Sequence, residues 1–264
     1  MITLASDFGS PYPAAMKGVL LSRTDAQLVD IAHDLPRQDP RAGAFWLRET
    51  IPYFPPAVHL AVVDPGVGTD RRAIALGVGD HVLVGPDNGL LRPVTRRLAE
   101  QSDPSIAAFE ITVDDPASTT FHGRDVFAPA AAAIHEQGVD RIDTVDLLSP
   151  IALDSCVDLR FPEPTRDDEA IHGEVLVVDD FGNVITNVPG EFLEDDLPEP
   201  SADATVNGVS APVVDTFDRV DAGSRLLTVG SHGYVECDVN EGRGDEAFGL
   251  GVGDAVDLVV DDSA

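Results

Sequence analysis

The sequence predicts an α/β domain with a mainly parallel sheet, followed by a smaller, mainly antiparallel β domain. Apolar runs of strand length alternate with helical stretches as far as Gln137, the pattern of a layered α/β domain. Composition then changes in LRFPEPTRDDE, residues 159–169, where prolines and clustered charge are typical of a linker. Short β-rich runs separated by turn residues follow. We therefore place the domains at residues 1–160 and 168–264.

Each element of the N-terminal domain is expected from its own residues. Pro40 suits the first turn of a helix, and Gly138 suits a helix end. Asp7 and Asp64 closely follow strand runs, so both are expected at the carboxyl ends of strands, where α/β sheets bind ligands. The expected strands are Ile2–Ala5, Gln27–Ile31, Val58–Val63, Arg72–Val78 and Val82–Gly85, and the helices are Ala14–Ser22, Asp39–Ile51, Asn88–Leu98 and Val126–Gln137.

The C-terminal domain is expected to consist of short strands joined by polar turns. An acidic segment with prolines, residues 191–203, is expected to be a solvated loop. The strands are expected at Gly173–Val178, Ala204–Val206, Leu226–Val229, Val235–Val239 and Ala255–Val260.

The charge of the chain excludes two classes of partner. With 47 acidic residues against 17 lysines and arginines, the formal net charge is −30. Such a surface repels nucleic acid and anionic membranes, whose phosphates require clustered cations. No apolar run is long enough to span a bilayer, and the N-terminus lacks the form of a signal peptide, so a cytoplasmic protein is expected. Adaptation to a salt-rich cytoplasm explains the charge better than cation binding, because salt screens the self-repulsion.

Cysteine and histidine spacing indicates neither a disulfide framework nor a metal site. The only cysteines are Cys156 and Cys237, and the seven histidines are scattered singly. No CxxC, HExxH or P-loop pattern occurs. We expect no metal.

Several polar residues lie beside glycine turns, and each has a structural alternative. Asp64 is followed by a two-glycine turn and then Arg71, either as a functional pair or as a structural ion pair. Asp7 either accepts ribose hydroxyls or caps a turn. His122 either acts as a base or orients water, or it is an ordinary packed histidine. Asn183 either pairs with an adenine edge or belongs to a turn.

Taken together, the motifs resemble one family. The ordered set SDFG, VVDPGVGT-x-R, GPDNGLL, TFHGRD-x-F-AP and DxFGN-x-x-TN is similar to the SAM hydroxide adenosyltransferases, relatives of fluorinase and chlorinase. The resemblance covers nearly the whole chain. It implies an N-terminal α/β domain and a C-terminal β domain. It also implies a homotrimer whose active sites lie between the N-terminal domain of one subunit and the C-terminal domain of its neighbour.

The resemblance also implies a reaction and a set of residues. Water attacks C5′ of S-adenosyl-L-methionine (SAM), giving adenosine and L-methionine without a cofactor or a metal, and some members prefer the (R)-sulfonium epimer. Asp64, Arg71 and His122 resemble the water-activating set. Gln38, Asp39 and Asn88 fall near the pocket. The residues similar to the substrate-binding positions are Asp7 at the ribose, Phe121 in the TFHG motif, Phe181, Asn183 and Phe217 at adenine, and Asp179, Ser231 and His232 at the methionine end.

Two departures from the family pattern affect the methionine end. The segment after Gly9 is short and lacks the usual acid before Pro11-Tyr12, and His232 stands where the halogenases have arginine. Two alternatives to hydrolysis are a SAM-dependent halogenase and a non-catalytic SAM- or adenosine-binding protein. An anionic Asp64 would repel halide, which favours water as the nucleophile. The presence of all three water-activating residues argues against a mere binding protein.

Overall fold

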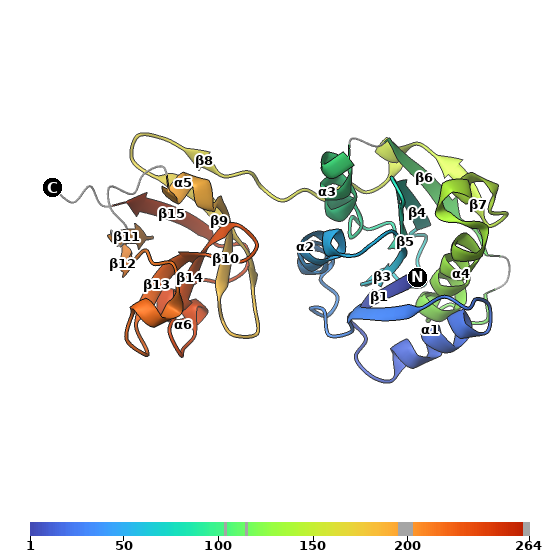
Figure 1. Cartoon of the computed structure of the whole chain (residues 1–264), viewed down its shortest axis with the longest axis horizontal. Coiled ribbons are helices and arrows are strands. Elements are labelled where there is room, and N and C mark those ends of the chain that lie inside the picture. The colour runs from blue at the N-terminus through green and yellow to red at the C-terminus, as the bar shows by residue number, and fades with distance from the viewer. Residues whose placement is uncertain (103–104, 114–115, 195–202, 261–264) are drawn as a thin grey trace. The chain divides into compact units, whose positions relative to one another are not determined.

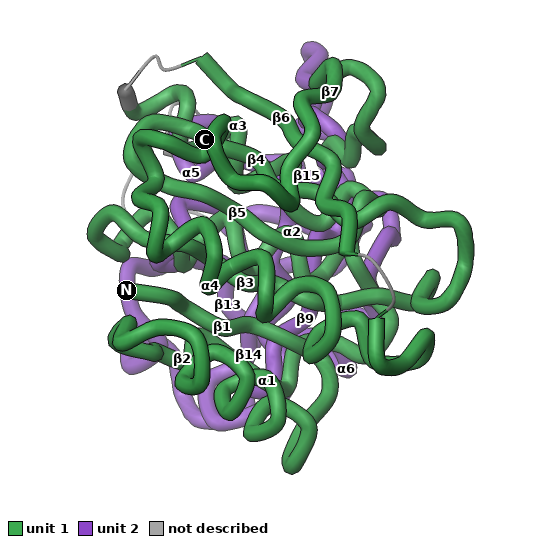
Figure 2. Tube along the Cα trace, turned by 90° about the vertical axis from the view of Figure 1, so that its right-hand side faces the viewer, with its two compact units in different colours: residues 1–160 green, residues 161–264 purple. Residues whose placement is uncertain are grey.

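The computed structural model describes residues 1–102, 105–113, 116–194 and 203–260. The chain divides into an N-terminal unit, residues 1–160, and a C-terminal unit, residues 161–264, coloured separately in Figure 2. Each unit is described by itself.

The N-terminal unit is a sheet with helices on both faces (Figure 1). Its described strands run in the order β2-β1-β3-β5-β4-β6-β7; β2, β1, β3 and β5 are parallel, while β4 and β7 are antiparallel to their neighbours. The strands are β1 Ile2–Ser6, β2 Leu28–Ala32, β3 Val58–Val62, β4 Ala73–Val78, β5 His81–Pro86, β6 Ile106–Ile111 and β7 Leu148–Ile151.

Helices α1 and α4 cover one face of this sheet, and α2 and α3 lie on the other (Figure 1). Met16 and Leu20 of α1 pack with the alanines of α4 against strand residues such as Leu4 and Leu60, all of them buried. Asp39 begins α2 by accepting hydrogen bonds from two backbone N–H groups of its first turn. The helices are α1 Tyr12–Leu21, α2 Pro40–Thr50, α3 Arg92–Ser102 and α4 Ala128–Gln137; short helical turns occupy Ile51–Tyr53, Gly123–Phe127, Val139–Thr144 and Leu153–Ser155.

The C-terminal unit is an antiparallel sheet. Its described strands follow the order β12-β11-β15-β9-β10-β14-β13, with β8 paired to β9. A bridge between Val213 and Leu227 brings the β12 end of the sheet towards β13. The elements are β8 Thr165–Arg166, β9 Ile171–Val178, β10 Val184–Pro189, α5 Gly190–Glu194, β11 Asp203–Val206, β12 Val209–Pro212, a helical turn at Phe217–Arg219, β13 Arg225–Val229, β14 Tyr234–Val239, α6 Gly244–Phe248 and β15 Ala255–Val260.

The predicted fold class is confirmed, and the differences lie in individual elements. The helix expected from Asn88 begins at Arg92, because the Asn88 side chain accepts a hydrogen bond from Leu90 N and holds the chain in a turn. Strands β6, β7, β10 and β12 were not predicted, and β8 lies within the expected linker. Of the expected acidic loop 191–203, residues 195–202 lie outside the described part. Its first residues, 191–194, belong to α5.

Candidate active site

The carboxyl ends of β1 and β3 form a topological switch point in the N-terminal unit. From β1 the chain passes to β2 on one side and then to β3 on the other, and Ser6 pairs with Val62 in parallel register. Asp7 and Asp64 follow these two strand ends, as predicted. Such crevices are the usual ligand sites of α/β sheets. A cavity of 810 Å³ opens there, lined by Asp7, Phe8, Tyr12, Arg37, Gln38, Asp64, Ser118, Thr120, Phe121 and Arg124.

The glycine turn after Asp64 folds Arg71 back onto that carboxylate. Backbone hydrogen bonds from Val67 N to Asp64 O and from Thr69 N to Gly66 O form the turn. Gly68 has φ +79°, a conformation that favours glycine. Arg71 Nη2 then lies 2.6 Å from Asp64 Oδ2, and both side chains are buried.

His122 completes the group from a distant part of the chain. Arg71 Nη2 lies 3.0 Å from His122 Nδ1. Since a guanidinium only donates, Nδ1 must accept, and neutral His122 therefore carries its proton on Nε2. The Arg71 guanidinium also lies over the Phe127 ring, 5.3 Å from its centroid. Asp64, Arg71 and His122, predicted from three separate positions, are in mutual contact through Arg71.

The charges of this group are set by burial and by one another. Burial raises the pKa of Asp64, and the positive charge of Arg71 opposes that rise. Burial and Arg71 both lower the pKa of His122, while Asp64 and Asp125 oppose them. At neutral pH the site therefore holds a neutral imidazole beside an ion pair, and the carboxylate of that pair is more basic than that of a solvent-exposed aspartate.

Two atoms of the ion pair are left without partners. Asp64 Oδ1 and Arg71 Nε are buried and make no hydrogen bond with any described residue. A buried carboxylate oxygen without a donor is energetically costly unless a ligand or water supplies one. Asp64 also lines the cavity, so its unpartnered Oδ1 belongs to a residue at the candidate ligand site.

Asp7 and Phe121 also lie at the cavity. Asp7 is buried, and its Oδ2 accepts a hydrogen bond from Gln38 N at 2.8 Å. Phe121 makes edge-to-face contacts with Phe8 and Tyr12. These three aromatic rings form an apolar patch on the wall.

Asp39 and Asn88, also expected near the pocket, have structural roles. Asp39 begins α2. Asn88 Nδ2 donates to Val63 O at 2.8 Å, which fixes the residue before Asp64. Neither belongs to the cavity lining.

Sequence reasoning did not assign Phe8, Tyr12, Arg37, Ser118, Thr120 or Arg124 to the site, yet all of them line the cavity. Phe8 and Tyr12 adjoin the SDFG motif, and Thr120 and Arg124 flank Phe121-His122, so proximity to the motifs was the available signal. Arg124 forms a two-point ion pair with Asp125 and stacks over Phe121.

The remaining predicted residues lie in the C-terminal unit. Asp179, Phe181 and Asn183 form one turn between β9 and β10: Asp179 Oδ1 accepts from the backbone N of both others at 2.9 Å. Asp179 Oδ2 accepts from Asn183 Nδ2 at 3.1 Å. Phe181 projects from this turn, 77% exposed. Phe217 begins a short helical turn, while Ser231 and His232 lie in the turn between β13 and β14.

The described residues hold neither a metal-binding cluster nor a membrane-spanning helix. They contain no group of three or more histidine, cysteine or acidic residues placed to hold a metal ion. Among them no helix has the length and apolar character needed to cross a membrane.

Comparison with known proteins decides the family. The model of the SAM hydroxide adenosyltransferase N-terminal domain matches residues 2–144, and that of the C-terminal domain matches residues 173–257. The chain belongs to the SAM hydroxide adenosyltransferase family. The family resemblance expected from the five motifs is thereby confirmed.

Relatives and solved structures agree with this assignment. Proteins named (R)-S-adenosyl-L-methionine hydrolase from Salinispora tropica and Thermus thermophilus are 42% and 40% identical to this adenosyltransferase-family chain; each match covers 96% of it and 95% or 97% of the relative. A fluorinase from Nocardia brasiliensis is 25% identical, covering 89% of this chain and 88% of that protein. The crystal structure of an uncharacterized conserved protein from Thermotoga maritima superposes with a TM-score of 0.82 at 32% identity, covering 98% of this chain and all of that one.

Proposed function

We propose that this member of the family hydrolyses SAM to adenosine and L-methionine. The single observation that carries the proposal is the Asp64–Arg71–His122 group, in which the cavity-lining Asp64 keeps a buried oxygen, Oδ1, without a donor. The hydrolase names of the 40–42% identical relatives support it.

The proposed reaction is a displacement at C5′. Asp64 Oδ1 accepts a hydrogen bond from a water molecule and orients its lone pair towards C5′. The water oxygen forms the new C–O bond as the C5′–S bond breaks, and methionine leaves as a neutral thioether, so no general acid is needed. The proton released by the water passes to Asp64 and then to solvent. Burial makes Asp64 a stronger base, and Arg71 together with neutral His122 holds its orientation. No cofactor is required.

The substrate-binding roles are part of the same proposal. Asp7 binds the ribose hydroxyls, and Phe121 supplies apolar contact beside them. Phe181, Asn183 and Phe217 form the adenine pocket, whereas Asp179, Ser231 and His232 bind the amino-acid end. The exposure of Phe181 leaves its ring accessible to a ligand, which is compatible with this role.

We further propose that the protein is a homotrimer in which the catalytic group and the adenine pocket of each site come from two subunits. The family resemblance supports this, as does the location of the two residue sets in separate units. Mixing Asp64→Asn and Asn183→Ala variants under conditions of subunit exchange should restore activity that neither variant has alone. A monomer by light scattering, or no recovery on mixing, would contradict the arrangement.

Product analysis tests the reaction itself. We expect purified protein incubated with both sulfonium epimers of SAM to release adenosine and methionine, with the (R)-epimer consumed first, as the names of the relatives suggest. The fluorinase relative makes halogenation the second candidate. Formation of 5′-chloro-5′-deoxyadenosine in high KCl would establish it, whereas bound but unchanged SAM would indicate a binding protein.

A further inference from the structure

Two adjacent residues, Asp87 and Asn88, hold the two ends of the loop between β3 and β4 that carries Asp64 and Arg71. Asp87 directly follows β5, and Arg72 directly precedes β4, so they lie at the open end of this hairpin. Asp87 Oδ2 accepts hydrogen bonds from Arg72 Nε at 3.0 Å and from Arg72 Nη2 at 2.6 Å. Asn88 holds the other end of the loop through its hydrogen bond to Val63 O.

The carbonyl oxygen of Arg72 links Asp87 to the catalytic group. It accepts a hydrogen bond from Asp87 N at 3.0 Å and another from Arg71 Nη1 at 2.5 Å. The Arg71 guanidinium is thus held on one side by the Arg72 carbonyl and on the other by Asp64 and His122. A rotation of the Arg72 backbone would therefore displace the Arg71 guanidinium, whose Nη2 contacts both Asp64 and His122.

The Asp87 carboxylate is itself firmly fixed. Its side chain is 3% exposed, and Oδ1 accepts from Val157 N at 2.8 Å while Oδ2 binds Arg72. Both oxygens are therefore satisfied, as a buried carboxylate requires. The GPDNGLL motif gains a specific role from these contacts.

We propose that Asp87 is a positioning residue that orients Arg71, and through it Asp64 and His122, by holding Arg72. It is not a cavity-lining residue, and its link to Arg71 runs through Arg72. The kinetic part of this inference rests on the proposed hydrolase function. The structural part, the orientation of Arg71 beside His122, does not.

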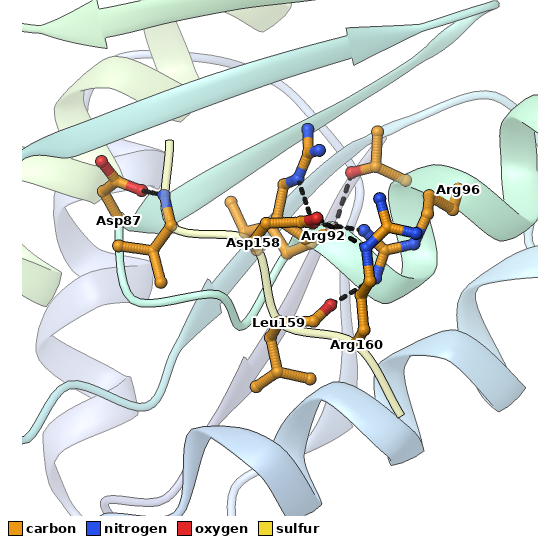
Figure 3. A network of polar contacts seen from close by, with 9 residues as sticks. Asp87, Arg92, Arg96, Asp158, Leu159 and Arg160 are labelled. Atoms are coloured by element: carbon orange, nitrogen blue, oxygen red, sulfur yellow. Dashed lines mark hydrogen bonds and ion pairs between the residues drawn. The ribbon is translucent and has the colours of Figure 1, made fainter. Parts of the chain in front are cut away.

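The neighbouring Asp158 provides a matched control (Figure 3). It lies one residue beyond Val157 and binds three arginines: Oδ1 accepts from Arg92 Nε at 3.1 Å and Arg96 Nη1 at 2.5 Å, and Oδ2 accepts from Arg160 Nε at 2.8 Å. None of these arginines contacts Asp64, Arg71 or His122 through a bond found in the described residues. Asp158→Asn therefore removes ion pairs from the same segment without disturbing the site.

The kinetic experiment compares the two variants. Asp87→Asn should lower kcat by about tenfold or more while the KM for SAM changes by less than about twofold, because a small misplacement of a catalytic group acts on the transition state. Asp158→Asn should lower the melting temperature and leave kcat unchanged. If Asp87→Asn does not fold, Arg72→Gln, which alters the more exposed partner, is measured instead with the same expectation.

A titration of His122 separates this inference from the proposed reaction. The groups facing His122 are Arg71, Asp64 and Asp125. Releasing Arg71 removes a positive charge from beside the ring, so the His122 pKa followed by NMR should rise in Asp87→Asn and stay unchanged in Asp158→Asn. An unchanged His122 pKa with kcat no lower than in Asp158→Asn would overturn the positioning role. Failure of the wild type to form adenosine would instead refute the proposed function.

Discussion

Arg71 Nη2 lies 2.6 Å from Asp64 Oδ2 and 3.0 Å from His122 Nδ1, so one nitrogen joins a carboxylate to a neutral imidazole. This arrangement leaves each partner one polar group that Arg71 does not bind, Oδ1 on Asp64 and Nε2–H on His122. One accepts and the other donates, which is what a bound water molecule needs from its surroundings.

Replacing Asp64 by asparagine should abolish turnover while substrate binding persists. The amide keeps the shape of the carboxylate, but it is neutral and too weak a base to receive the proton of the attacking water. We expect kcat to fall by at least about 100-fold, measured as adenosine released, with SAM affinity by calorimetry changed little. Asp158→Asn, which removes ion pairs with Arg92, Arg96 and Arg160 away from the site, is the control. Substantial turnover by Asp64→Asn would show that another group receives the proton.

Activity should fall as the pH drops below neutrality, and Arg71 should determine the pH at which it falls. His122 must be neutral to accept from Arg71, and its lowered pKa keeps it neutral to a pH below 6.5. Without the Arg71 charge, the pKa values of both His122 and Asp64 rise. The acid limb of the kcat/KM profile should therefore move to higher pH in Arg71→Gln, in addition to a general loss of activity. A limb that stays in place would show that neither group controls it.

The site was predictable where polar residues follow strands. Asp7 and Asp64 lie where the strand pattern predicted, because parallel strands bring their carboxyl ends together. The contact of His122 with Arg71 spans 51 residues, and no local pattern encodes it; the motif resemblance supplied it. Phe8 and Tyr12 escaped prediction because their role depends on packing around Phe121, which only the folded backbone determines.

The fold was predictable where hydrophobic periodicity is strong. The parallel strands β1, β2 and β3 are apolar runs with few alternatives. By contrast, β7 reads LSPI, and its proline obscures the strand signal. Strand β10 begins within the DxFGN-x-x-TN motif, whose polar residues resemble an extended turn. Pairing with β6 and β9 decides these strands, and such tertiary pairing is absent from local propensity.

The stability of the protein should increase with KCl. At a net charge of −30 the acids repel one another, and salt shortens the range of that repulsion from roughly 10 Å at about 0.1 M to roughly 3 Å at about 1 M. We expect the melting temperature to rise across that range. Sucrose over the same concentration range is the control, because it does not screen charge and so reports only the effect of a solute excluded from the protein surface. A melting temperature indifferent to KCl would contradict adaptation to salt.

The C-terminal unit should lose stability as the pH rises through neutrality. Glu236 and Asp238 lie on one face of β14. Burial and then the charge of Asp179 raise the pKa of Glu236 to about 7, and burial and then the charge of Glu236 raise the pKa of Asp238 to about 8. Both oxygens of Asp238 lack a partner in the described structure. The folded unit therefore binds more protons than the unfolded chain between about pH 4 and pH 8, and its unfolding free energy falls over that interval.

Asp238→Asn should remove much of this penalty. We expect the variant to gain at least about 1.4 kcal/mol at pH 8, the equivalent of one pKa unit, and little at pH 5. Asp221→Asn, at an exposed acid of the same unit, is the matched control. An equal gain at both pH values would show that charge burial is not the cause.

The N-terminal unit should respond to pH in the opposite direction. Thr3 Oγ1, His59 and His81 form a hydrogen-bonded chain, with 2.8 Å from Thr3 to His59 Nδ1 and 2.9 Å from His59 Nε2 to His81 Nδ1. Burial and the neighbouring imidazole lower the pKa of His59 to about 3. The unfolded chain then binds the extra proton below pH 6.5, so the stability contributed by neutral His59 is complete above that pH and is lost as the pH falls towards 3.

This response can be assigned to one residue by hydrogen exchange resolved along the chain. Between about pH 7 and pH 5 the N-terminal unit should lose about 2 kcal/mol of unfolding free energy, and His59→Gln should reduce that loss. The control is His172→Gln in the C-terminal unit, where Asp257 and Asp167 raise the histidine pKa and so reverse the sign. Because the two units carry opposite pH responses, the strands around His59 should be the first to exchange on acidification, and those around Asp238 the first above pH 8. If both units lost protection from hydrogen exchange together, at acid pH and again above pH 8, the buried imidazole and the buried carboxylates would not be what limits the stability of each unit.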